Sequence, residues 1–219
     1  MSSWKDIGNA TNNIREKGLP EHGDLRKNWD LWQLHENVSN FDDNITIFDF
    51  GCSGLFALNF LSEMGFKNLY GIDLYPLSTY IEDLAFLVKK KIKNRNTPKI
   101  SRGNALNNNF PNGFFDLTVS ISVIEHGVPL KQFFSEVSRI LKEDGLLFIT
   151  TDYWPQKIKS PSKRHIFYYD EIIKMINIAK ECGFNPCFDS IPDSKNRVIF
   201  CRGRWYTFLC TTFKKGLEG

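Results

Sequence analysis

Acidic and small residues cluster where two strands are predicted to end. The run Ile45–Gly54 begins apolar and β-branched, as a strand buried on both faces does, and ends Asp-Phe-Gly-Cys-Ser-Gly. A second such run, Asn68–Asp73, also ends in an acidic residue. A small-residue turn from strand to helix offers free backbone N–H groups, and a carboxylate after the next strand accepts hydrogen bonds from ribose hydroxyls. This spacing predicts a site for a nucleoside.

The turn argues against a nicotinamide dinucleotide. Such a cofactor calls for three glycines that let its pyrophosphate approach the backbone. Here only Gly51 and Gly54 are present, and no basic residue is at hand to meet a phosphate. Asp49 and Asp73 instead make the predicted pocket acidic, which suits a nucleoside with a cationic end.

Two histidines are candidates for proton transfer. His126 follows the predicted strand 114–121, and His165 precedes a predicted helix, so both are expected to face the crevice. Histidine is the side chain best suited to act as a general base near neutral pH, and His126 is the favoured one. Asp152 could orient that histidine or be the base itself. His126 with Asp152 could also bind a divalent ion, but two candidate ligands are too few to predict a metal site.

Alternating strand and helix patterns must position these residues. The strands are predicted at 45–50, 68–73, 97–101, 114–121 and 146–151, and helices at about 54–64, 77–92, 130–141 and 169–182. This order predicts an α/β, doubly wound, Rossmann-like sheet whose ligand crevice lies at the carboxyl ends of the central strands. Two late strands, near 186–191 and 204–213, predict an antiparallel hairpin at one edge.

The segment before residue 45 is expected to be a helical cap, 1–44, on a ligand-binding domain, 45–219. Residues 1–24 are predicted as loop or short helix and 25–39 as a helix that packs beside the core or covers the pocket. The length of 219 residues fits one structural domain overall.

Composition limits the partners and the compartment. A net charge of +3 is too small to indicate a nucleic-acid partner, and no apolar run approaches membrane-spanning length. Five cysteines with no Cys-x-x-Cys pair favour reduced thiols. We therefore expect a cytoplasmic protein with a small-molecule substrate; the sequence leaves its oligomeric state open.

The motifs in order resemble those of the class I S-adenosylmethionine (SAM)-dependent methyltransferases. They are Phe-Asp-Phe-Gly-Cys-Ser-Gly, Gly-Ile-Asp, Gly-Asn-Ala, Phe-Asp-Leu with Val-Ile-Glu-His, and Leu-Lys-Glu-Asp-Gly-Leu-Leu-Phe-Ile, within about 45–185. The resemblance implies that fold, SAM as cofactor and S-adenosylhomocysteine as product. It implies that the methionine moiety is held by Asp49 and by the backbone of Gly51, Cys52, Ser53 and Gly54. The ribose would bind to Asp73, and the adenine would contact Leu74, Asn104 and Ala105. Ser120 and Ile121 would border the methyl-bearing sulfur.

Two positions depart from the pattern of that family. Ser53 stands where the family usually has glycine, and Asn104 where an acidic residue is usual. The amide oxygen of Asn104 can still accept a hydrogen bond from the adenine amino group.

The acceptor is indicated by a narrower resemblance. No Asn/Asp-Pro-Pro-Tyr motif follows the fourth strand, which argues against methylation of nucleobases. The stretches 27–30 and 150–155 and the Tyr-Thr-Phe near the end resemble small methyltransferases of bacterial capsule and lipopolysaccharide gene clusters. This implies O-methylation of a sugar, a nucleotide sugar or a polysaccharide substituent, with candidate substrate contacts at Lys27, Trp29, Tyr153, Trp154 and Arg164. N- or C-methylation of another metabolite and a non-catalytic SAM-binding role remain as alternatives.

Overall fold

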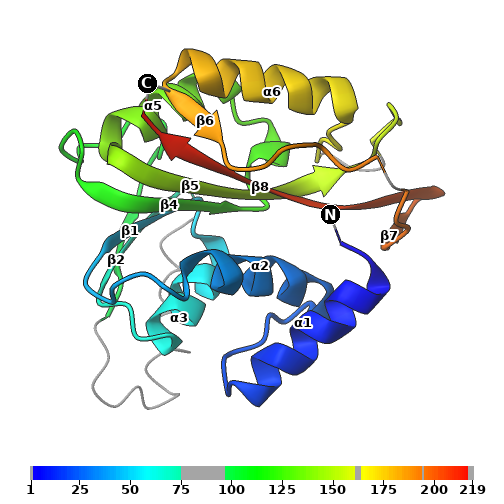
Figure 1. The fold of residues 1–219 in the computed structure, drawn as a ribbon, viewed down its shortest axis with the longest axis horizontal. Coiled ribbons are helices and arrows are strands. Elements are labelled where there is room, and N and C mark those ends of the chain that lie inside the picture. The colour runs from blue at the N-terminus through cyan, green and yellow to red at the C-terminus, as the bar shows by residue number, and fades with distance from the viewer. Residues whose placement is uncertain (1, 75–96, 161–163, 194, 217–219) are drawn as a thin grey trace.

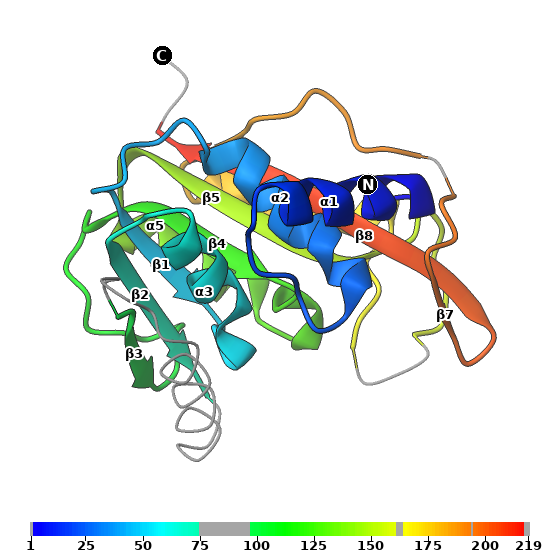
Figure 2. The ribbon, with the colours of Figure 1, turned by 90° about the horizontal axis from the view of Figure 1, so that it is seen from below.

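A central sheet separates two layers of helices (Figure 1). The computed structural model describes residues 2–74, 97–160, 164–193 and 195–216. Helices α5 (Leu130–Ile140) and α6 (Tyr169–Glu181) cover one face of the sheet. Helices α1 (Trp4–Glu16), α2 (Asn28–Val38) and α3 (Phe56–Glu63) cover the other, as Figure 2 shows from that side. The helix predicted at 77–92 lies outside the described residues.

The strands run in the order β3-β2-β1-β4-β5-β8-β6, with β7 paired to β8. Neighbours from β3 to β5 are parallel, and β8 is antiparallel to β5, β6 and β7. The predicted doubly wound α/β sheet is therefore confirmed. The bounds of the strands are β1 Thr46–Phe50, β2 Asn68–Asp73, β3 Lys99–Arg102, β4 Phe115–Ile121, β5 Leu141–Tyr153, β6 Phe184–Pro186, β7 Ile199–Cys201 and β8 Arg204–Lys215.

The last strands differ in detail from the prediction. The strand expected near 186–191 lies earlier, at β6, and β8 lies inside the sheet between β5 and β6. The tight hairpin is made by β7 and β8 instead. β5 also begins five residues earlier than expected, because the chain stays paired with β4 at Phe115 across an irregularity in register.

The N-terminal segment is more helical than its glycines suggest. α1 begins with a capping box, in which the Ser3 side chain accepts from the amide of Asp6 and the Asp6 carboxylate accepts from the amide of Ser3. The predicted helix at 25–39 divides into a 3-10 turn, η1 (Leu25–Lys27), followed by α2. Two further 3-10 turns, η2 (Ser53–Leu55) and η3 (Ile124–His126), follow β1 and β4.

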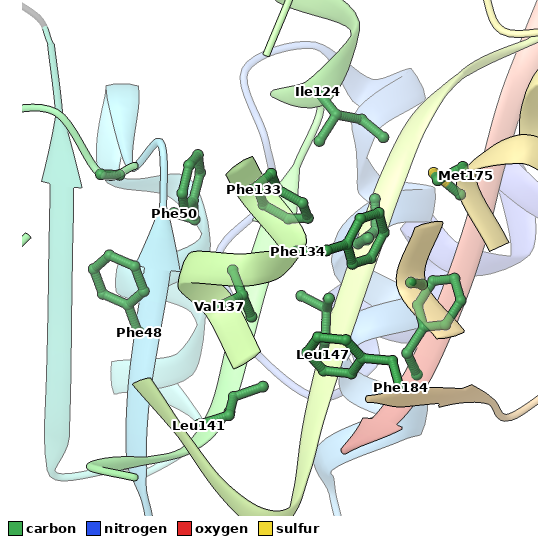
Figure 3. Close-up of a cluster of buried hydrophobic side chains, with 14 of the residues drawn as sticks. Phe48, Phe50, Ile124, Phe133, Phe134, Val137, Leu141, Leu147, Met175 and Phe184 are labelled. Carbon is green, nitrogen blue, oxygen red and sulfur yellow. The ribbon is translucent and has the colours of Figure 1, made fainter. Parts of the chain in front are cut away.

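Two apolar layers hold the sheet from either side. The layer under α5 and α6 is rich in phenylalanine, and Phe50 packs edge-to-face on Phe133 with ring centroids 4.8 Å apart (Figure 3). On the other face Ile14, Leu34 and Val38 of the N-terminal helices join side chains of β1, α3 and β4 in one buried cluster. The segment before residue 45 is thus part of the core, and burial of its apolar face fixes where its polar residues lie.

Candidate active site

A cleft of about 780 Å³ opens at the carboxyl ends of β1, β2 and β4, within the usual size range of small-molecule sites. Predicted and unpredicted residues share its wall: His22, Asp24, Lys27, Leu31, Asp49, Phe50, Gly51, Ser53, Phe56, Ala57, Ile72, Asp73, Leu74, Gly103, Asn104, Ala105, Leu106, Ile121, Ser122, Val123, His126, Val128 and Arg164.

The turn after β1 requires glycine. Gly51 has φ +81°, and a Cβ there would lie 2.7 Å from the methyl groups of Val123. Gly54 has φ +73°, and a Cβ there would lie 2.5 Å from the ring of Phe56. Leu55 is also left-handed, so α3 begins at Phe56, two residues later than predicted. Gly51 and Ser53 both line the cleft. Because glycine has no side chain, a ligand can approach the backbone at Gly51 directly.

Asp49 lies at the bottom of the cleft and is only 2% exposed. Burial, with the nearby carboxylate of Asp73, raises the pKa of Asp49 to about 8. A cation or N–H donor beside Asp49 would favour the ionised form. SAM carries both a sulfonium and an ammonium group, so this carboxyl fits the methionine end of that cofactor.

Asp73 ends β2 and is joined to the turn. Its Oδ2 accepts from the backbone N–H of Ser53 at 3.0 Å. An ionised carboxylate has about four acceptor sites, so ribose hydroxyls fit beside the Ser53 bond. Leu74, 71% exposed, stands at the rim of the cleft where a flat base would pack.

The loop after β3 forms another part of the cleft wall. The Asn104 side-chain oxygen accepts from the backbone N–H of Leu106 at 3.0 Å, which closes a local turn. Ala105 is buried at the cleft wall, and Leu106 and Val128 add apolar surface. These residues form an apolar slot with amide groups along its edge, which suits adenine.

Three residues predicted to contact the cofactor do not line the cleft: Cys52, Gly54 and Ser120. Ser120 is fully buried in β4 and does not line the cleft, whereas Ile121 and Ser122 do. Cys52 is buried against Gly71, where a Cβ would lie 2.7 Å from the Cys52 sulfur. The Cys52 side chain therefore fills space between β1 and β2.

The opposite end of the cleft carries cations. Lys27 of η1 places its ammonium 2.5 Å from the hydroxyl of Ser122, 3.2 Å from a carboxylate oxygen of Asp30 and 3.6 Å from the ring centre of Phe208. Arg164 also lines this end. Ser122 has φ +55°, a conformation that non-glycine residues rarely adopt and that often marks functional sites. Sequence reasoning missed Ser122, although it follows the fourth strand directly.

His126 lines the cation-rich end of the cleft. Burial of its ring lowers the pKa of His126 below 6.5, and the positive charge of Arg164 adds to this effect. The carboxylate of Asp152 acts in the opposite direction. The imidazole is therefore neutral near pH 7 and able to accept a proton.

Buried carboxyl groups lie behind this part of the wall. Asp30, Glu125 and Asp152 are at most 1% exposed, and none of them lines the cleft. Burial raises the pKa of each, to about 8 for Glu125, whose Oε2 accepts from the hydroxyl of Thr151 at 3.1 Å. The charge of Lys27 favours ionisation of all three, which makes it the cationic centre of this group.

Four predicted residues lie away from the cleft. His165 bonds through Nε2 to a carboxylate oxygen of Glu171 at 2.7 Å, at the start of α6. Trp29, Tyr153 and Trp154 are at most 8% exposed and belong to apolar clusters, since large rings gain most from burial. Among the described residues, no group of three or more His, Cys, Asp or Glu side chains is placed to hold a metal. Nor is any described helix long and apolar enough to cross a bilayer.

Comparison with known proteins agrees with this geometry. Residues 48–149 match the family model of a methyltransferase domain. Residues 48–149 therefore form a SAM-dependent methyltransferase domain. The matched residues of this methyltransferase run from β1 to β5 and carry the cleft wall from Asp49 to His126. No curated protein matches the sequence.

Solved structures share the fold of this methyltransferase. A putative sarcosine dimethylglycine methyltransferase from Galdieria sulphuraria is 16% identical, with a TM-score of 0.68, over 95% of this chain and 98% of that one. The geranyl diphosphate C-methyltransferase from Streptomyces coelicolor is 15% identical, with a TM-score of 0.64, over 90% and 85%. The [4+2]-cyclase SpnF is 12% identical, with a TM-score of 0.72, over 98% and 94%. Because one of these proteins is a cyclase, the shared fold does not determine which reaction is catalysed or which acceptor is bound.

Proposed function

We propose that this methyltransferase transfers the methyl group of SAM to a hydroxyl of an anionic, sugar-like small molecule. The class we favour is a sugar phosphate, a nucleotide sugar or a polysaccharide substituent, in the cytoplasmic assembly of bacterial surface carbohydrate. The observation that carries this proposal is the polar end of the cleft, where Lys27, Ser122, His126 and Arg164 share one wall. The resemblance of 27–30 and 150–155 to capsule and lipopolysaccharide methyltransferases supports it.

The two ends of the cleft differ in charge, and this difference orients the two substrates. Asp49 and Asp73 suit the cationic methionine end and the ribose of SAM. Lys27 and Arg164 suit a phosphate or carboxylate on the acceptor, and both disfavour a protonated amine. An acceptor with an anionic group therefore fits this end of the cleft better than one that binds as a cation.

Methyl transfer to a hydroxyl requires a base. Bound SAM supplies a methyl group on a sulfonium, whose departure as a neutral thioether needs no acid. The acceptor oxygen forms a bond to the methyl carbon as the carbon–sulfur bond breaks, and the hydroxyl proton must leave. His126 is neutral near pH 7 and takes this proton, while the charge of Asp152 stabilises the imidazolium that forms. The hydroxyl of Ser122, held by Lys27, is placed to orient the acceptor oxygen.

One comparison favours C-methylation as the second candidate. The S. coelicolor structure contains geranyl diphosphate, so this fold accepts a diphosphate acceptor in that protein. Lys27 and Arg164 would suit a diphosphate here as well. A prenyl chain, however, calls for a long apolar wall, and the acceptor end of this cleft is polar.

A turnover screen tests the proposal. The purified protein is incubated with SAM and with matched pairs of acceptors, each a nucleotide sugar or sugar phosphate and its uncharged counterpart, and products are read by mass. We expect a gain of one methyl group on a hydroxyl of the charged member and a much lower rate on the uncharged one. Methylation of prenyl diphosphates or amines instead of sugars would overturn the proposed acceptor. Calorimetry should detect binding of SAM and of S-adenosylhomocysteine to the protein. Failure of both to bind at millimolar concentration would contradict SAM-dependent catalysis itself.

A further inference from the structure

A cationic and aromatic surface surrounds the β7–β8 hairpin. It comprises the rings of Phe200 and Trp205 and six exposed cations, and we call it the hairpin surface. The cations are Lys157, Lys159, Lys195, Arg197, Arg202 and Arg204. The methyltransferase reaction as described above uses none of these residues.

The hairpin is tight and presents its two rings side by side. β7 and β8 join through Arg202 and Gly203, whose φ values of +48° and +79° form the kind of two-residue turn that matches the twist of a hairpin. Phe200 and Trp205 are paired across the strands with ring centroids 4.9 Å apart, and they remain 59% and 36% exposed. Large apolar rings kept in water on a short, well-defined hairpin indicate a binding surface.

The charge of this surface is of one sign. Among the described residues, none of the six cations forms an ion pair with a carboxylate. The sequence from 195 to 215 contains no Asp or Glu. The other 22 of the 28 lysines and arginines lie outside this surface, as do all 25 Asp and Glu residues.

The loop at 156–160 contributes two of these cations. Ile158 packs against the buried cluster that also contains Val198 and Ile199, the latter in β7. Lys157 and Lys159 flank Ile158 in sequence, and the ammonium of Lys157 lies 5.8 Å from the ring centre of Tyr168.

The hairpin surface lies beside the acceptor end of the cleft. The pairing of β5 with β8 reaches Tyr153 opposite Thr207, so the residues of β7 and the start of β8 extend past the carboxyl end of β5 (Figure 2). The cleft opens at this same edge of the sheet. Arg164 of the cleft wall is also close enough to Tyr206 to affect its pKa.

We propose that the hairpin surface binds an anionic lipid bilayer. Aromatic rings settle at the interface between headgroups and acyl chains, and arginines bind phosphate groups with two parallel hydrogen bonds. Clustered cations add electrostatic attraction to anionic lipids. A second copy of this chain is a poorer occupant, because a symmetric contact would place six cations against the same six cations. Bound in this way, the acceptor end of the cleft would lie beside the bilayer, where a lipid-linked acceptor would be presented.

Vesicle sedimentation tests the proposal with the 219-residue chain. Vesicles of phosphatidylcholine alone are compared with vesicles that contain one quarter phosphatidylglycerol, at low and at physiological salt. We expect binding to the anionic vesicles that weakens with salt, and little binding to the neutral ones. The double variant Arg202→Gln/Arg204→Gln should bind about 25-fold more weakly, since each cation near such a surface contributes about a fivefold factor. Phe200→Ser/Trp205→Ser should also lose binding, which would show that the rings enter the interface.

Matched controls separate this surface from general charge and hydrophobicity. Lys5→Gln/Lys17→Gln removes two exposed cations elsewhere, and Trp4→Ser removes an exposed ring from α1. Both controls should bind vesicles as the parent does. Equal binding to neutral vesicles, or equal losses in the controls, would overturn the proposal. A change of mass in lipid-free solution for Phe200→Ser/Trp205→Ser would assign the surface to a second copy, and binding of a DNA oligonucleotide but not of vesicles would assign it to nucleic acid.

The vesicle test is independent of the proposed acceptor. Transfer of methyl groups to soluble acceptors is measured without lipid for the parent and for both double variants, and unchanged rates are expected. Loss of vesicle binding with unchanged turnover would therefore test the surface alone.

Discussion

The ammonium of Lys27 lies 3.2 Å from the carboxylate of Asp30, a side chain with no exposed surface. Asp30 is carried by α2, while the ammonium of Lys27 reaches the hydroxyl of Ser122, 95 residues later in the chain. This ion pair ties the N-terminal helices to the acceptor end of the cleft. A ligand anion over Lys27 would therefore be held by the same group that neutralises a buried acid.

Lys27→Met should impair both stability and acceptor binding. Removing one partner of a buried ion pair costs about 3 kcal/mol. Burial raises the pKa of Asp30 even beside Lys27, so the loss should grow once pH passes this raised pKa. Above it the carboxyl is ionised in the folded parent, whereas in the folded variant it stays protonated. Denaturant unfolding at pH 5 and pH 8 measures the loss. The double variant Lys27→Met/Asp30→Leu should recover much of the stability without recovering KM for a phosphorylated acceptor. Equal KM values for the parent and both variants would exclude Lys27 from acceptor binding.

Asp49 should link binding of SAM to pH. Its pKa of about 8 in the folded protein lies above its ordinary value of 3.8, so this carboxyl lowers the stability of the ligand-free protein as pH rises from about 4 to 8. A cationic ligand favours the ionised form, so binding at pH 7 should release a proton, and affinity should rise from pH 6 to pH 8. Calorimetry in buffers of different ionisation enthalpy measures that proton. Asp49→Asn should weaken binding of SAM at least tenfold and abolish the release, whereas proton release unchanged in Asp49→Asn would contradict this assignment.

Gly51→Ala should destabilise the protein and weaken binding of SAM. Its left-handed backbone disfavours alanine by about 1–2 kcal/mol, and the added methyl would lie 2.7 Å from the side chain of Val123. Gly8 in α1 is the matched control, since a Cβ there meets nothing within 4 Å. Gly8→Ala should raise stability by about 0.5–1 kcal/mol, as expected within a helix. Thermal unfolding with and without SAM checks both variants, and Val123→Ala combined with Gly51→Ala should recover only the steric part of the loss.

His126→Gln should lower kcat at least 100-fold while leaving the affinity for SAM within about threefold. The parent enzyme should lose kcat/KM on acidification, because the imidazole must be neutral to accept the proton. The midpoint of that loss should lie below pH 6.5, since burial and Arg164 lower the pKa of His126. The control is His165→Gln, whose ring binds Glu171 outside the cleft. Similar losses of rate in the two variants would contradict the assignment of the base to His126.

The local patterns of the sequence specify most elements of the fold. Period-two and buried runs marked the strands, and apolar stripes marked α5 and α6 within a residue or two. The placement of Asp49 and Asp73 at one edge followed from topology alone, because parallel strands carry their carboxyl ends to the same edge. The small residues after β1 likewise indicated a tight turn. At Gly51 this turn has a positive φ, which only glycine adopts without strain.

Contacts between distant segments decided the rest. Period alone cannot tell an aromatic side chain that faces a ligand from one that faces the core, and Tyr153 and Trp154 are buried because β8 and the 195–201 segment cover them. The pairing of β8 with β5 likewise depends on residues about sixty positions apart.

The two ends of the cleft differ in how far the sequence predicts them. The sequence by itself determined the fold and the convergence of Asp49 and Asp73 on one cleft, because both depend on local backbone geometry and on strand order. Only the tertiary structure brought Lys27 to Ser122 and placed Asp30 beneath them. The physical reason is that α2 is positioned by burial of Leu31, Leu34 and Val38 against the sheet, and the polar residues of the same segment are carried with it.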